Sequence, residues 1–447
     1  MPDLRNFWGQ WQHHRMIFAI ALPMIISNIA APLLGLVDTA IIGHLERPIY
    51  LSAVALGAMV VSFIYLLTVF LRMTTTGDIA RAFGAEDIRR QQQTVVHGLW
   101  FAVGLGLVIM VAAPGVISLA WWLIEPQPEL AQLSAKYIDI RLWAAPAALI
   151  NLVVLGVLLG RQQSRQAMLL VIFTNAVNVV ADVILVVILD FNVAGAAWAS
   201  VIAEVSTAML GLYLIRTLLA GSNWGIKWPG MQRFLGMNRD VFIRSLLLQL
   251  CIATMTGYAA RYGVVVVAAN AILMQFLMLI SLGLDGIAYA VEALTGAAIG
   301  RKRAAEVRYW MRLTLIWSII FAVGYSLVFL LFGSSIVRLL TDLPAVISAA
   351  ESYLPWLIAL PLLAHWSYYF DGVYIGLGLT RAMRDTMAIS ALAVFVPVWQ
   401  VSQWLLTNDN ANHGLWLALS LFLFARGVSQ WLYLKRPGLT PEQRIHQ

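Results

Sequence analysis

Asp38 is the residue whose surroundings most clearly suggest chemistry. It is the only formally charged residue between Met16 and Gly43, a stretch long and apolar enough to cross a bilayer. An acid at the centre of a membrane costs about 2.5–3.5 kcal/mol, so such a residue ordinarily has a function or a partner. Pro23 and Pro32 precede it, and proline interrupts the hydrogen bonding of a helix. The stretch therefore predicts a bendable membrane helix that carries a proton-sensitive group.

Further polar residues lie at membrane depth in the first half of the chain. Asn175, Asn178 and Asp182 are spaced i, i+3 and i+7, which places them on one face of a helix. Asn151 and Glu204 fall within neighbouring apolar stretches. Amides can donate to a carboxylate or accept from a carboxylic acid. We expect these residues to form a polar pocket with the acid of the first stretch. Alternatively, such residues only hold neighbouring membrane helices together by hydrogen bonds. This interpretation applies chiefly to Asn151, Asn175 and Glu204.

The second half carries its own set of intramembrane acids. Asp285 and Glu292 are spaced i and i+7, and Asp371 lies in a later apolar stretch. Arg244 lies near one end of the stretch 241–262, so ion pairing between helices is one interpretation. The other is a cation or substrate site, to which aromatic side chains such as Tyr289 could contribute their ring faces. The sequence leaves both open.

The motifs of enzymes and ATP-driven pumps are absent from the sequence. It has no Walker A loop, no GxSxG and no HExxH. Its single cysteine, Cys251, excludes an intramolecular disulfide, and its seven histidines form no metal-spaced pair at depth. We therefore expect no enzymatic activity, no metal and no cofactor. Any energy must come from an ion gradient or from the gradient of a substrate.

The composition is that of a polytopic membrane protein. Hydrophobic residues make up 61% of the 447 residues and charged residues 11%, against about 25% in a soluble domain. Apolar runs of membrane-spanning length predict an all-α protein with twelve transmembrane helices. The predicted spans are 17–43, 50–72, 95–124, 132–160, 167–190, 195–219, 241–262, 266–298, 309–333, 349–378, 385–406 and 412–434.

The basic residues indicate the orientation of these spans. With both termini in the cytoplasm, five of the 29 Lys and Arg residues lie outside and the rest lie inside. The five are Arg47, Lys136, Arg141, Arg261 and Arg338. This distribution follows the positive-inside rule, so we expect a multi-pass protein of a bacterial inner membrane with cytoplasmic termini.

A polar connection at 220–240 divides the chain into six-helix halves at 1–219 and 241–447. The halves echo one another weakly in the proline and glycines of their fourth spans. These residues are Pro146, Gly156 and Gly160 in the first half and Pro361, Gly372 and Gly376 in the second. Repeats in the same direction predict pseudo-two-fold symmetry along the membrane normal. Glycines four residues apart indicate close helix packing.

Two segments carry a resemblance to a known family. Residues 22–45, which read LPMI…PLLGLVDTAIIGHL, resemble the first helix of MATE (multidrug and toxic compound extrusion) transporters. Residues 285–296 resemble the eighth helix of the subgroup called DNA-damage-inducible protein F, and Asn178 with Asp182 matches its polar fifth helix. The resemblance runs over nearly the whole chain.

The resemblance implies a V-shaped pair of six-helix bundles that exports drugs or toxic organic compounds in exchange for H⁺ or Na⁺. It implies that Asp38 carries the proton, that the first helix bends at Pro23, and that Asn178 and Asp182 supply a hydrogen-bond network. Sodium-coupled relatives use an acid on the seventh helix, where this sequence has none. Asp371 keeps sodium coupling open.

Two other functions remain as alternatives. A flippase for lipids or polyprenyl-linked glycans would belong to the same superfamily, but it would need basic residues at depth to bind pyrophosphate. A membrane-embedded enzyme acting on lipids would need a nucleophile or a metal set that the sequence lacks. The expected partners are small organic, amphipathic or cationic substrates and membrane lipid. We expect a monomer that binds no nucleic acid.

Overall fold

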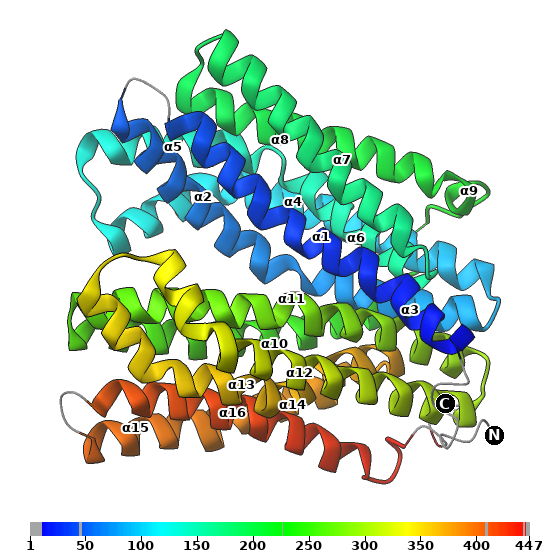
Figure 1. The fold of residues 1–447 in the computed structure, drawn as a ribbon. Helices are drawn as coiled ribbons and strands as arrows, with labels where there is room; N and C mark the ends of the chain where they lie inside the picture. The colour runs from blue at the N-terminus through cyan, green and yellow to red at the C-terminus, as the bar shows by residue number, and fades with distance from the viewer. Residues whose placement is uncertain (1–10, 44–46, 226, 407–409, 441–442, 444–447) are drawn as a thin grey trace. The chain divides into compact units, whose positions relative to one another are not determined.

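The computed structural model describes the chain apart from residues 1–10, 44–46, 226, 407–409, 441–442 and 444–447. The described residues form helices and short connections, with no β-strand among them (Figure 1). The first half contains α1 (Trp11–Gly43), α2 (Pro48–Thr68), α3 (Phe70–Gly84), α4 (Ile88–Ile124), α5 (Pro128–Leu142), α6 (Ala145–Gly160), α7 (Ser164–Asp182), the π-helix η2 (Val183–Ile188), α8 (Asn192–Leu214) and α9 (Arg216–Leu219). The second half contains α10 (Trp228–Ala259), the 3₁₀-helix η3 (Ala260–Tyr262), α11 (Val264–Gly300), α12 (Ala304–Leu340), α13 (Pro344–Leu377), α14 (Thr380–Ser390), the π-helix η4 (Ala391–Phe395), α15 (Val396–Leu405) and α16 (Ala411–Leu434).

These helices confirm the predicted all-α membrane protein. Eleven helical segments among the described residues are long and apolar enough to cross a membrane. A twelfth crossing is formed if α5 and α6 make one span, bent by 51°. The bend falls at Trp143 and Ala144, just before Pro146 at the start of α6. Proline favours the first turn of a helix and disfavours its continuation, so the residue that starts α6 also limits α5.

The chain divides into two compact units, each described here by itself. One contains Leu22–Asn238, and the other contains Met1–Ala21 together with Arg239–Gln447. We call them the N-unit and the C-unit. Both α1 and α10 pass from one unit to the other, and α1 does so beside Pro23. The sequence-based boundaries at 219 and 241 stay a prediction, although helix α10 already begins at Trp228 within the predicted linker.

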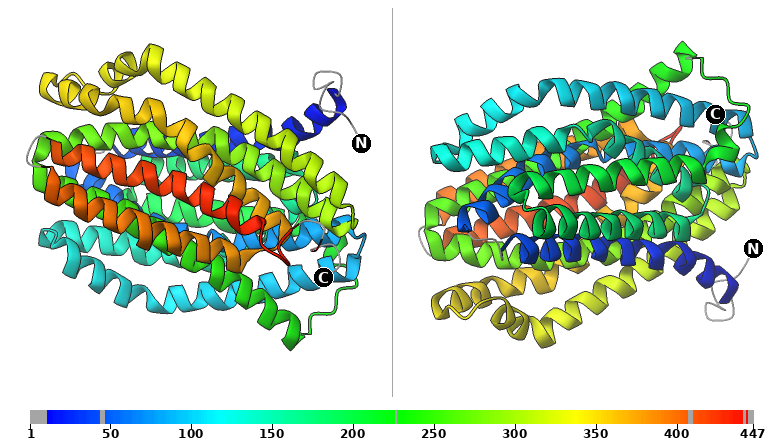
Figure 2. Two further views of the ribbon diagram at one scale, coloured as in Figure 1. Left: turned by 90° about the horizontal axis from the view of Figure 1, so that it is seen from below. Right: turned by 90° about the horizontal axis from the view of Figure 1, so that it is seen from above.

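Glycines allow the closest helix contacts within each unit. In the N-unit α3 packs on α6, and in the C-unit α11 packs on α13 (Figures 1 and 2). A Cβ on Gly156 would lie 2.8 Å from the carbonyl oxygen of Arg72, and one on Gly372 would lie closer still to that of Ala288. These separations are too short for any side chain. The prediction that the paired glycines serve close packing is confirmed.

Two π-helical segments interrupt the fifth spans of the two halves, η2 at the end of its span and η4 in the middle of its span. η2 follows directly after Asp182 at the end of α7, and η4 follows directly after Ser390 at the end of α14. π-helical turns are rare and often lie at functional sites. Because a π turn takes more residues than an α turn, it changes which face of the span the following side chains occupy.

Candidate functional site

Helix α1 carries Asp38 into the interior of the N-unit. Its proline at position 23 has no N–H to donate to the preceding turn, and the Ser27 hydroxyl donates to the carbonyl oxygen of Pro23 over 2.9 Å. Beyond Pro32, the Thr39 hydroxyl donates to the carbonyl oxygen of Gly35 over 2.7 Å. Side-chain bonds of this kind weaken the regular backbone pattern and bend helices. The backbone hydrogen bonding of α1 is therefore weakened both before and after Pro32.

The carboxyl groups of Asp38 and Asp182 lie within electrostatic reach of one another. Asp182 is 1% exposed, and Asp38 is half-buried. The Oδ1 atom of each acid is buried and accepts no hydrogen bond from a described residue. Two negative charges that lie close together inside a protein repel one another, and a proton on either carboxyl removes this repulsion. The structure thus brings together two of the acids singled out in the sequence, from helices far apart in the chain.

Asn178 lies one turn before Asp182 on α7 and is 2% exposed. Its Nδ2 atom donates to the hydroxyl of Ser200 on α8 over 3.3 Å, while its Oδ1 atom is buried without a hydrogen-bond partner among the described residues. An amide held by its nitrogen presents its oxygen as an acceptor, which a protonated carboxyl could use. Asn175 is half-buried on the same helix.

Arg141 is a charged member of this site whose location the sequence analysis got wrong. It was counted among the residues on the outer side, but its side chain is only 13% exposed and pairs with Glu204 over 2.9 Å. Both Asp38 and Asp182 lie within its electrostatic reach. The available signal was its position nine residues inside the predicted span 132–160. Assigning each Lys and Arg to the nearest connection between spans placed Arg141 outside the span and hid that signal.

Two tyrosines and an asparagine complete the surroundings of this ion pair. The ring centroid of Tyr65 lies 5.7 Å from the guanidinium carbon of Arg141, and Tyr137, which is 6% exposed, lies within electrostatic reach of the same arginine. The Nδ2 atom of Asn151 donates to the backbone oxygen of Glu204 over 3.0 Å. Asn151 therefore joins α6 to α8. The tyrosines escaped the sequence analysis because aromatic residues in membrane helices carry no distinguishing spacing.

The C-unit has a different polar centre, in which Asp371 is bound by two arginines. Arg244 and Arg426 both donate to its Oδ2 atom, and the Nε2 atom of Gln430 donates to Oδ1 over 3.2 Å. The ion-pair interpretation of Arg244 therefore holds for Asp371. This centre joins α10, α13 and α16.

The other acids predicted for the second half lie on α11. Asp285, Tyr289 and Glu292 share one face of that helix. Glu292 is 2% exposed, and Arg244 lies within electrostatic reach of Asp285. No group of three His, Cys, Asp or Glu side chains in the described part of the chain could hold a metal ion.

An apolar cavity of about 420 Å³ lies between α7, η2 and α8, on the face of α7 that is turned away from Asn178 and Asp182. Ala181 and Ile184 line it, and the Ile184 side chain is 44% exposed, so the cavity opens on the surface of the N-unit. The remaining lining residues are Phe173, Ala176, Val177, Val180, Leu185 and Ile202. The cavity offers no charge of its own, so it suits an apolar or amphipathic molecule.

These features define a polytopic helical membrane protein with a buried, ionisable carboxyl pair of the kind found on ion pathways. A family model described as MatE matches residues 23–184 and 241–399, and the chain belongs to this family. DNA damage-inducible protein F of Escherichia coli (strain K12) is 42% identical over 421 residues, which cover 93% of this chain and 90% of that protein. Multidrug export protein MepA of Staphylococcus aureus (strain NCTC 8325 / PS 47) is 24% identical over 430 residues, covering 94% and 93%.

Solved structures share the fold over nearly the whole chain. A crystal structure of MATE in the bent conformation superposes with a TM-score of 0.84 at 21% identity, covering 97% of this chain and 95% of that one. An outward-facing multidrug resistance MATE family transporter of the MOP superfamily gives 0.83 at 21% identity, with 96% and 95% covered. The family and the all-α fold predicted from the sequence are confirmed.

Proposed function

We propose that the protein exports small organic, amphipathic or cationic compounds across a bacterial inner membrane in exchange for protons. The observation that carries this proposal is the electrostatic coupling of the Asp38 and Asp182 carboxyls inside the N-unit. Relatives named for multidrug export and detoxification match over more than 90% of this chain, and this supports export as its activity. The basic residues support cytoplasmic termini, and we propose that the protein acts as a monomer.

The proposed cycle begins with a proton that arrives from the outside. It neutralises Asp38, whose hydroxyl then donates to Asp182 or to the unpaired Oδ1 atom of Asn178. The new hydrogen bond draws α1 toward α7, and the helix bends near Pro23, where its backbone bonding is already interrupted. The bend narrows the substrate cavity, and the substrate leaves. Release of the proton to the cytoplasm resets the site.

Proton coupling is favoured over sodium coupling by the ligands that each unit supplies. Sodium needs several oxygen ligands that remain available to it, whereas a carboxyl pair needs only to gain and lose a proton. Asp371 already binds two arginines, which satisfy its charge without an external cation. The pair in the N-unit has no such direct partner, because the nearby Arg141 is bound to Glu204.

The flippase alternative finds less support. Binding a pyrophosphate needs arginines or lysines whose charge faces a cavity. The interior does contain basic residues, more of them than the sequence suggested. However, Arg141 pairs with Glu204, while Arg244 and Arg426 pair with Asp371. Each of these three arginines is already bound to an acid inside the protein.

The test is transport of an organic cation such as ethidium in proteoliposomes under an imposed pH or sodium gradient. Wild type should respond to the pH gradient, and D38N and D182N should fall to the level of protein-free vesicles. Asp139 is an exposed acid on α5, so D139N is the matched control and should transport like wild type. Each variant must elute as a monodisperse species so that loss of transport is separated from loss of folding.

Two results would contradict the proposal. Wild-type rates in D38N would remove the acid from the mechanism. If the wild type responded to the sodium gradient alone, the proposed site could still act in transport, but the coupling ion would be Na⁺ and not H⁺.

A further inference from the structure

Helix α8 connects the ion pair of Arg141 and Glu204 to the helix that carries Asp182. Ser200 and Glu204 are one turn apart on α8, so they share one side of that helix. The Ser200 hydroxyl accepts a hydrogen bond from Asn178 on α7 over 3.3 Å, and Asn178 lies one turn before Asp182. The ion pair and the acid pair therefore belong to one polar cluster inside the N-unit.

Hydrogen-bonding groups of this cluster are only partly used. The Nη1 atom of Arg141 donates to the Oε1 atom of Glu204 over 2.9 Å. The Nε atom of Arg141 and the Oε2 atom of Glu204 are buried without a partner among the described residues, and so are the Oδ1 atoms of Asp38 and Asp182. The cluster therefore holds an unused donor on its arginine and an unused acceptor on each of its acids.

The titratable groups around the acid pair come from several helices of the N-unit. They are Asp38 of α1, Tyr65 of α2, Tyr137 and Arg141 of α5, Asp182 of α7 and Glu204 of α8. Helix α6 and the part of α4 beyond His97 carry no titratable side chain. Arg141 is the cation of this set, and both Asp38 and Asp182 lie within its electrostatic reach. A change of charge at Arg141 therefore acts on both acids.

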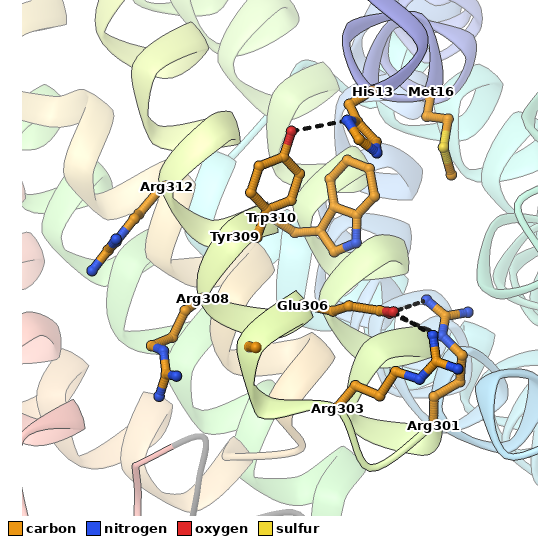
Figure 3. A pocket seen from close by; sticks show the side chains of 10 residues that line it. His13, Met16, Arg301, Arg303, Glu306, Arg308, Tyr309, Trp310 and Arg312 are labelled. Carbon is orange, nitrogen blue, oxygen red and sulfur yellow. Dashed lines mark hydrogen bonds and ion pairs between the residues drawn. The ribbon is translucent and has the colours of Figure 1, made fainter. Parts of the chain in front are cut away.

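Glu306 of the C-unit shows the opposite ratio of acids to arginines. It accepts hydrogen bonds from Arg301 and Arg303 over 3.1 and 2.7 Å, which Figure 3 marks with dashed lines. An acid held by two cations keeps its negative charge, because both cations favour the ionised form. In the N-unit three acids of the cluster share one arginine, so their negative charge exceeds its positive charge until a proton binds.

We propose that Arg141, held in place by Glu204, sets the pH at which the carboxyl pair of Asp38 and Asp182 gains and loses its proton. The arginine favours the ionised form of the pair, and Glu204 limits this effect by neutralising part of the arginine's charge. The inference rests on the proton-coupled export proposed above, in which the pair must bind a proton on one side of the membrane and release it on the other. Arg141 acts on transport through the two acids.

The experiment is an infrared titration of the purified protein in detergent micelles, which records the absorption of protonated carboxyl groups and needs neither a gradient nor a substrate. In each protein the signal of the pair is the part that disappears when D38N and D182N are added. R141Q should raise the midpoint of this signal by about one pH unit, and E204Q should lower it by about one pH unit. R141Q/E204Q should lie between the two, because it removes both charges.

Two sets of variants separate charge from packing and stability. R141K keeps the positive charge, so its midpoint should lie closer to wild type than to R141Q. The matched control is the exposed ion pair of Arg47 and Glu129, whose side chains are 52% and 56% exposed, and R47Q and E129Q should leave the midpoint unchanged. If E204Q is too unstable to purify, a midpoint of R141Q/E204Q below that of R141Q provides the same test.

Shifts of R141Q and E204Q in the same direction, or an unchanged midpoint in R141Q, would overturn the proposal. An R141K midpoint like that of R141Q, an equal shift in the control variants, or a pair that gives no titration signal would do the same. Transport driven by a pH gradient together with unmoved midpoints would leave the proposed function and remove the role of Arg141. Opposite shifts without such transport would leave the role of Arg141 and remove the proposed coupling.

Discussion

The buried pair of Arg141 and Glu204 allows a prediction in which the two partners are not equivalent. Their closest atoms are 2.9 Å apart and their side chains are 13% and 15% exposed. Charges at about 4 Å attract one another by about 4 kcal/mol at the effective dielectric of a protein. Removing one partner of such a buried pair costs about 3–5 kcal/mol, because the other charge is left without a partner.

The E204Q variant should bear this whole cost at any pH below 12, because arginine does not lose its proton. The R141Q variant can reduce this cost, because the Glu204 carboxylate left without its partner can bind a proton and lose its charge. That costs about 1.4 kcal/mol for each pH unit above its solution pKa of about 4.3, or ~4 kcal/mol at pH 7 and ~1 kcal/mol at pH 5. R141Q should therefore regain stability as the pH falls to 5, and E204Q should not.

Unfolding in mixed detergent micelles, followed by circular dichroism at pH 7 and pH 5, measures this difference. The double variant R141Q/E204Q should be more stable than E204Q alone, because it leaves no charge unpaired. Glu129 forms an exposed ion pair with Arg47, so E129Q should be unchanged at both values. Equal losses in E204Q and R141Q at pH 5, or a double variant no better than E204Q, would refute the reasoning.

Two further predictions concern packing and the charged centre of the C-unit. A Cβ on Gly156 would lie 2.7 Å from the Cβ of Thr75, so G156A should lose about 1–3 kcal/mol of stability. Gly104 has no neighbour within 4 Å of a Cβ, so G104A should gain up to about 1 kcal/mol from helix propensity. D371N strands two buried arginines and should lose about 3–5 kcal/mol, whereas the exposed D342N should not change. Thermal unfolding of the purified variants tests both pairs, and equal melting temperatures within either pair would contradict its explanation.

Much of the architecture could be predicted from the sequence, because a bilayer demands long apolar helices whatever their neighbours are. The expected twelve spans correspond to eleven helical segments and one bent pair. The glycines at 156 and 372 could also be interpreted correctly, because only close backbone approach gives glycine an advantage at that spacing.

The partners of charged residues could not be predicted in the same way. Arg141 pairs with a residue 63 positions away, and Asp371 binds arginines 127 and 55 positions away. Such pairings depend on the packing of whole helices. Sequence spacing reveals only which residues share a face of one helix. For this reason Asn178 and Asp182 could be placed together, whereas the position of Arg141 was wrong.

The two π-helical segments lie in the fifth spans of the two halves, but at different points along them. η2 ends its span at Ile188, whereas η4 is followed by the ten residues of α15. The residue before η2 is Asp182, and the residue before η4 is Ser390, whose hydroxyl donates to the carbonyl oxygen of Thr386 over 2.8 Å. A π turn therefore forms with or without an ionisable group before it. The irregular backbone does not by itself mark an ionisable site, and what distinguishes the first half is the acid at the edge of its π turn.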